Sequence, residues 1–243
     1  MGAARLTQYV FRRIVCLGHY LVRTRHLHLH ITTPPLTRDA DGATHLDLLT
    51  CYVDSSNGNA ELGASYGGFV LASRGVPPAR AAPTTPPRTA PPTSAATSGA
   101  EAGSHGGGAI AWRCSAPPQG DDSSGASELR MATLAYKYLL AAHLLLAELR
   151  VGVTPSGPTP FYLDAQAVLD GTSCERLAKK SRWMAMRYAK LRWGIACGTI
   201  DPRKLPSSRN PSDGLTKCLV GSAFRNARAR LLGHPLPCLE PAD

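Results

Sequence analysis

The sequence lacks several features that would place it in a familiar class of protein. No apolar run reaches the roughly 18 residues that a membrane-spanning helix needs, and the first residues contain no apolar core followed by a cleavage site. The 7 cysteines are odd in number and include no Cys-x-x-Cys pair. These absences argue against a membrane span, a secretory signal, a zinc ribbon and a secreted disulfide framework. They predict an intracellular protein in a reducing compartment.

Acidic residues are also scarce. The 243 residues include 17 Asp and Glu against 27 Lys and Arg, which gives a formal net charge of +10. Such an excess favours a polyanionic partner, and we expect nucleic acid rather than the alternative, an anionic membrane surface. A chain of this length can bury a core and form one or two domains.

Hydrophobic periodicity predicts a mixed α/β fold. The pattern predicts strands at 45–54, 65–73, 108–114, 159–164 and 200–205, and helices at 7–24, 123–150, 165–169, 176–196 and 210–232. The consecutive early strands favour antiparallel pairing, whereas the later alternation of strands and helices favours parallel pairing. Pro202 predicts that the last strand lies at an edge of the sheet, because proline donates no ladder hydrogen bond.

Composition divides the chain into four parts. Residues 1–44 form a basic segment, and 45–233 hold the predicted α/β domain. Within that domain, 74–105 consists of little besides Pro, Ala, Thr, Ser and Gly, so it cannot bury enough apolar surface to order itself. We therefore expect a disordered insertion there, between two strands that can still pair as a hairpin. Residues 234–243 read as a tail.

Four carboxylates stand at informative positions in this basic chain. Asp54 and Asp164 each end a predicted buried strand, and Glu128 and Asp213 each lie near the start of a predicted helix. Carboxylate oxygens are the ligands that Mg²⁺ prefers. Two such ions roughly 4 Å apart can activate water and stabilise the leaving oxygen of a phosphodiester. We predict that Asp54, Glu128, Asp164 and Asp213 are catalytic metal ligands for two Mg²⁺ ions, or Mn²⁺ in their place. Structural acids that cap turns are the alternative for each one.

The predicted helix 176–196 has two distinct faces. One face is an apolar stripe of Leu177, Met184, Tyr188, Leu191 and Ile195, and the other is a basic stripe of Arg176, Lys180, Trp183, Arg187 and Lys190. Cations can meet backbone phosphates while an aromatic ring lies against a sugar or base, so the second stripe is a candidate nucleic-acid surface. A merely solvated helix face is the alternative.

Short motifs in a fixed order resemble the ribonuclease H domain of copia-type LTR retrotransposon Pol polyproteins. They are YVD at 52–54, SYGGFV at 65–70, GGAIAW at 107–112, SSGASE at 123–128, TPFYLDAQ at 159–166, MRY at 186–188 and NPSDGLTK at 210–217. The family's Asp-Glu-Asp-Asp set falls on Asp54, Glu128, Asp164 and Asp213. The resemblance implies a five-stranded mixed sheet flanked by helices and hydrolysis of the RNA strand of RNA–DNA hybrids. The basic segment 7–30 is similar to the connection that follows the reverse transcriptase in such polyproteins, which implies a reverse transcriptase domain as a partner.

The chain departs from the family pattern at several points. Ala165 stands where the family has Asn, Ala126 where it often has a second Glu, and Trp183 where it has His, and the Pro-rich insertion is foreign. These departures spare the four acids but leave two other interpretations open. One is a catalytically impaired remnant that still binds nucleic acid, and the other is a translated element fragment without a selected role.

Overall fold

The computed structural model describes residues 15–27, 29, 31, 37–38, 44–45, 49–56, 66–73, 107–116, 123–148, 157–174 and 179–233. The predicted insertion at 74–105 and the predicted tail at 234–243 lie outside the described residues, as do residues 1–14. None of the described helices combines the length and the apolar character needed to span a bilayer.

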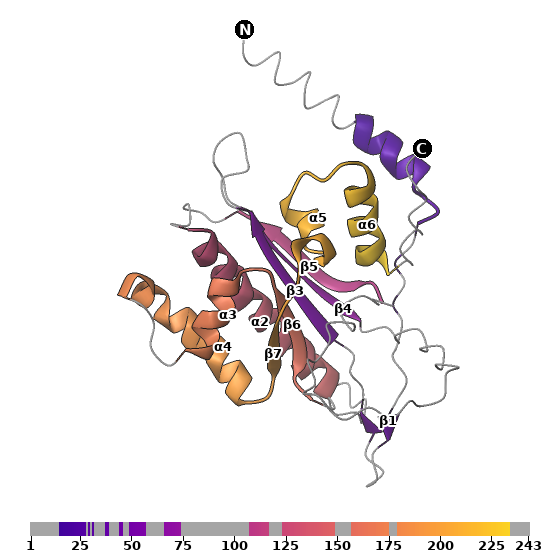
Figure 1. Ribbon diagram of the computed structural model, residues 1–243. Coiled ribbons are helices and arrows are strands. Elements are labelled where there is room, and N and C mark those ends of the chain that lie inside the picture. The colour runs from indigo at the N-terminus through magenta and orange to yellow at the C-terminus, as the bar shows by residue number, and fades with distance from the viewer. Residues whose placement is uncertain are drawn as a thin grey trace, which may run out of the picture.

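A mixed sheet of five strands forms the centre of the domain (Figure 1). Its strands are β3 (Leu49–Ser56), β4 (Tyr66–Ser73), β5 (Ala109–Ser115), β6 (Thr159–Leu163) and β7 (Ile200–Lys204), in the order β5-β4-β3-β6-β7. β3 pairs with β4, and β4 with β5, in antiparallel fashion, whereas β3–β6 and β6–β7 are parallel. The predicted pairing directions and the edge position of β7 are therefore confirmed. A separate pair, β1 (Thr37–Arg38) and β2 (Thr44–His45), precedes the sheet.

Alternating side chains of the strands fill two cores, one on each face of the sheet. Cys51, Val53 and Phe161 point into the larger core, together with residues of α2 (Ser124–Glu148), α3 (Gln166–Ser173) and α4 (Ala185–Ala196). Tyr52, Val70 and Tyr162 point into the smaller core beside Leu215 and Leu231, which lie on α5 (Asp213–Thr216) and α6 (Gly221–Leu232). Helices α2, α3 and α4 thus cover one face, and α5 and α6 cover the other (Figure 1). The predicted mixed five-stranded sheet flanked by helices is confirmed.

Two predicted helices are divided in the structure. The helix predicted over 210–232 is wrong as one element: it consists of α5 and α6, with the 3₁₀ turn η3 (Ser207–Arg209) before them. Lys217 and Val220 are extended and Gly221 has φ +58°, a left-handed conformation that favours glycine, so the chain turns between the two helices. Similarly, the helix predicted over 176–196 begins as the 3₁₀ segment η2 (Lys179–Met184) and becomes α4.

Exposure also corrects parts of the predicted core. Met184, Tyr188 and Leu191 are buried as predicted, but Ile195 is 36% exposed at the end of α4. Helix α2 is not covered along its whole length, because Leu144 and Leu145 near its end are 66% and 56% exposed. Helix α3 continues through Gly171 to Ser173, beyond the end of the helix predicted at 165–169. A Cβ atom at Gly171 would lie 2.3 Å from the ring of Tyr188, so close packing of α3 on α4 explains this glycine.

Candidate active site

Asp54 and Asp164 lie at the ends of neighbouring parallel strands. Tyr52 of β3 is the register partner of Tyr162 of β6, so the acids two residues further on reach the same end of the sheet at the same level. Asp54 is fully buried, and Asp164 is partly exposed just beyond β6. Parallel pairing thus brings together two carboxylates that are 110 residues apart in the sequence.

Glu128 reaches this end of the sheet from the first turns of α2. Its Oε1 atom accepts hydrogen bonds from the backbone N–H groups of Asp164, at 3.2 Å, and Ala165, at 2.8 Å. The carboxylate is 3% exposed. Because the donors are backbone groups, alanine at position 165 does not weaken this contact.

Asp213 is brought to Asp54 by side-chain hydrogen bonds to the backbone of β3. Asn210 Nδ2 donates to the carbonyl oxygen of Val53 at 2.8 Å, and Ser212 Oγ donates to that of Tyr52 at 3.0 Å. These bonds hold segment 210–213 against β3 and place Asp213 at the buried start of α5.

Gly68 lets α5 approach the sheet closely. It is the register partner of Asp54 on β4, and a Cβ atom here would lie 3.0 Å from side-chain carbons of both Leu215 and Thr216. Such contacts are tighter than the normal van der Waals distance, so the absence of a side chain at 68 is what allows α5 to sit over the end of β3.

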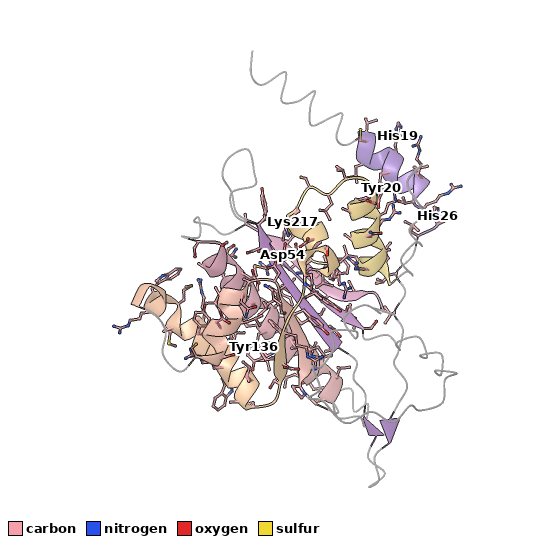
Figure 2. The ribbon with its side chains drawn as sticks, in the orientation of Figure 1. His19, Tyr20, His26, Asp54, Tyr136 and Lys217 are labelled. Carbon is pink, nitrogen blue, oxygen red and sulfur yellow. The ribbon has the colours of Figure 1, made fainter. Side chains whose placement is uncertain are left out.

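Lys217 places a positive charge between Asp54 and Asp213. Figure 2 shows Lys217 next to Asp54. Its Nζ atom donates to Asp213 Oδ1 at 2.8 Å, to Ser207 Oγ at 2.8 Å and to Asp54 Oδ1 at 3.4 Å. Ser207 Oγ in turn donates to Asp213 Oδ2 at 2.7 Å, and Thr216 Oγ1 donates to Asp54 Oδ2. The sequence analysis assigned no role to Thr216 or Lys217. Their spacing of three and four residues from Asp213, on one side of a helix start, is the signal that would have found them.

Burial and mutual repulsion raise the pKa values of two acids. Burial raises the pKa of Asp54 to about 6. The hydrogen bond from Thr216 and the charge of Lys217 act in the opposite direction, while the charge of Asp213 adds to the rise. Burial also raises the pKa of Glu128 to about 9, and the carboxylate of Asp164 is the next cause. Each acid therefore lies within electrostatic range of at least one other acid.

The donor chemistry of the cluster suits a divalent cation. All four side chains offer hard carboxylate oxygens, and Lys217 is the cation that bonds to two of them. In the part of the chain that the structure describes, however, no group of three or more His, Cys, Asp or Glu side chains is spaced to hold a metal ion as it stands. The residues fit a cation in chemistry and in charge, and their side chains would have to close around it.

A cleft of about 720 Å³ opens beside Lys217 and runs between α5 and the ends of β3, β4 and β5. It is lined by Ser56, Tyr66, Cys114, Leu215, Thr216, Lys217 and Cys218. Two of the lining residues, Thr216 and Lys217, also bond to the acids, so the cleft is continuous with the cluster.

The predicted nucleic-acid stripe is only partly exposed. Trp183 is 54% exposed, whereas Arg187 and Lys190 are partly buried, and Arg187 Nη1 has no hydrogen-bond partner among the described residues. Arg176 and the side chain of Lys180 lie outside what the structure describes. Met186 and Trp193 are exposed on the same helix, which the sequence analysis did not predict.

Among solved structures, the chain is similar to a distant neighbour. It is the crystal structure of RNase H1 from the halophilic archaeon Halobacterium salinarum NRC-1. That protein is 16% identical to this chain, the match covers 69% of this chain and 93% of the other, and the TM-score is 0.40. No family model and no curated protein matches the chain.

Proposed function

We propose that this protein is a metal-dependent endonuclease that hydrolyses the RNA strand of RNA–DNA hybrids. The observation that supports it best is the gathering of Asp54, Glu128, Asp164 and Asp213 at one end of the sheet of a strongly basic chain. Buried acids that repel one another are costly for a fold, so they indicate a site with a cationic ligand. The resemblance to ribonuclease H domains supplies the hybrid as the substrate class.

The cation in this proposal is Mg²⁺ or Mn²⁺, held by Asp54 and Asp164 on the strands with Glu128 and Asp213 beside them. When bound, two such ions supply charge stabilisation at a phosphate and an activated water. The chain itself contributes the fixed positions of the acids: Glu128 through the backbone N–H groups after β6, and Asp213 through Asn210 and Ser212.

The test is cleavage of a labelled RNA–DNA hybrid in Mg²⁺ and in Mn²⁺ by wild type and Asp164→Asn. An amide is nearly isosteric with a carboxylate but is a poor Mg²⁺ ligand, so we expect cleavage to fall below detection while the melting temperature is kept. Asp170→Asn is the matched control, because Asp170 is an exposed acid on α3 close in sequence. Full cleavage by Asp164→Asn would remove this residue from the site.

A second candidate function is hybrid binding without cleavage, by a catalytically impaired remnant. The position of Lys217 favours it, since an ammonium group already stands between Asp54 and Asp213. This alternative predicts that wild type binds hybrid but leaves it intact in both metals. A fragment without a selected role predicts neither binding nor cleavage.

The retroelement origin, an intracellular location and a reverse transcriptase partner are parts of the same proposal. The order of the seven motifs along the chain supports the origin and the partner, and the odd number of cysteines without a Cys-x-x-Cys pair supports the location. A purified reverse transcriptase of the copia type, added to the protein on a primed RNA template, is expected to increase cleavage of the newly formed hybrid. An unchanged cleavage rate would leave the partner unsupported.

A further inference from the structure

A second basic surface lies on the face of the sheet opposite α4. We call it the α6 surface, and it consists of Arg209 on η3, Arg225, Arg228 and Arg230 on α6, and Arg23 and Arg25 on and just after the N-terminal helix at 15–23. Neither 15–27 nor 214–233 contains an Asp or Glu. Its arginines come from the N-terminal helix and from 209–230, so no single local pattern predicts this surface.

Aromatic contacts hold the two helices of this surface together. The rings of Tyr20 and Phe224 meet edge to face, with centroids 5.9 Å apart. The guanidinium of Arg228 lies 6.0 Å from the first ring and 5.8 Å from the second. The N-terminal helix therefore lies beside α6, where Figure 2 shows Tyr20.

Among the described residues, no ion pair includes an arginine of the α6 surface, although the charge of Asp213 acts on Arg230. Arg230 Nη1 donates to the carbonyl oxygen of Ser208 at 2.7 Å, which holds it beside Arg209. Burial, and next the charge of Arg209, lower the pKa of Arg230. Two guanidinium groups that lie close together, and that form no ion pair among the described residues, complement the geometry and charge of a phosphate.

The α6 surface is joined directly to the acid cluster. Ser207, two residues before Arg209 in η3, bonds to both Asp213 and Lys217. A polyanion whose phosphate lies at the acids would therefore pass next over η3 and then over α6.

We propose that the α6 surface binds the sugar–phosphate backbone of the substrate duplex, next to the scissile phosphate and on the side away from α4. This inference rests on the proposed function for the identity of the substrate. The contacts are to phosphates, so they position the duplex without reading its sequence.

The test measures hybrid affinity as a function of salt, in EDTA and in the Asp164→Asn background, so that cleavage does not enter. Arg209→Gln/Arg225→Gln/Arg228→Gln should flatten the slope of log K against log salt by roughly two to three units, from about 0.9 per phosphate contact. Affinity at 0.1 M salt should fall at least about tenfold. Lys137→Gln/Arg113→Gln/Arg203→Gln is the control, because it removes the same charge from exposed positions elsewhere.

Each other outcome has a definite meaning. An unchanged affinity and slope in the α6 variant would overturn the inference, and so would an equal loss in the control, since net charge alone would then explain it. Loss of binding to phosphatidylserine vesicles with hybrid affinity unchanged would overturn it in favour of a membrane surface. If the triple variant melts early, Arg225→Gln alone should still flatten the slope by roughly one unit, because Arg225 is exposed. Absence of cleavage by wild type would refute the proposed enzyme, but these binding measurements would still decide the role of the surface.

Discussion

Two surfaces of the protein are basic but are built differently. We call the predicted stripe of Arg176, Lys180, Trp183, Arg187 and Lys190 the α4 surface and compare it with the α6 surface. On this surface the α4 cations Arg187 and Lys190 are partly buried, and the exposed side chains include the large rings of Trp183 on η2 and Trp193 on α4. On the other face of the sheet, Arg209 and Arg225 are exposed, and the aromatic rings are used to pack two helices together. The difference teaches that net charge alone does not distinguish the two surfaces. They differ in which cations face solvent beside the acids, and our proposal depends on that difference.

The largest effect is expected when both surfaces are changed at once. Lys180→Ala/Arg187→Ala/Lys190→Ala, combined with the α6 triple variant, should flatten the salt slope of hybrid binding by about five units, because the two sets lie on opposite faces and their effects should add. The measurement is affinity across a salt series for each triple variant and for the combination. If the α4 triple variant alone leaves hybrid affinity and its salt slope unchanged, the α4 surface is merely solvated. Only the α6 surface would then bind the hybrid.

Gly68→Ala should loosen the α5 face while leaving the α4 face intact. The added Cβ atom meets Leu215 and Thr216 at 3.0 Å, and such overpacking costs about 1–3 kcal/mol of unfolding free energy. For a domain of this size we expect the melting temperature to fall by roughly 3–10 °C. Gly125→Ala is the control, because a Cβ atom there meets nothing within 4 Å. Equal melting temperatures for the two variants would mean that α5 does not depend on Gly68.

Lys217→Met should make stability depend on a divalent cation. Without the ammonium group, Asp54 and Asp213 face each other uncompensated, which should cost about 1–3 kcal/mol, less than for a fully buried pair because Lys217 is partly exposed. Mg²⁺ should restore more of the melting temperature in this variant than in wild type, since the cation takes over the compensating role. Lys137→Met, at an exposed site on α2, is the control. A variant as stable as wild type in EDTA would contradict this account of Lys217.

Glu128→Gln should remove a pH dependence of stability in EDTA. The pKa of Glu128 is raised to about 9 in the fold, so the folded state binds a proton that the unfolded state releases above its ordinary value of 4.5. Stability is therefore fully present below that value and is lost as the pH rises toward 9. The amide can still accept the N–H groups of Asp164 and Ala165, and we expect Glu128→Gln to match wild type near pH 5 and exceed it by up to about 4 kcal/mol at pH 8.

Denaturant unfolding at the two pH values measures this difference. Glu148→Gln, at the exposed end of α2, should change nothing. A parallel decline of wild type and Glu128→Gln with pH would show that another group titrates.

Local sequence patterns were sufficient for the sheet and for the acids. The apolar runs of β3 and β6 predicted buried strands that end at Asp54 and Asp164, because alternation and strand length are properties of contiguous residues. Local patterns also predicted that Glu128 lies near the start of a helix, α2, and that α4 has a buried stripe that includes Tyr188 and Leu191. The family resemblance then grouped the four acids, although neither periodicity nor spacing specifies which strand ends meet.

Tertiary structure alone decided how the site and its surroundings are arranged. The predicted helix 210–232 is divided at Lys217–Gly221, after Asn210 and Ser212 have fixed the start of α5 to the backbone of β3. No local propensity reports hydrogen-bond partners more than 150 residues away. That division places Lys217 between Asp54 and Asp213 and turns α6 toward the N-terminal helix. The α6 surface follows from the same cause: its arginines form one surface only after the segments that carry them pack together, because charge proximity depends on distance in space and not on distance along the chain.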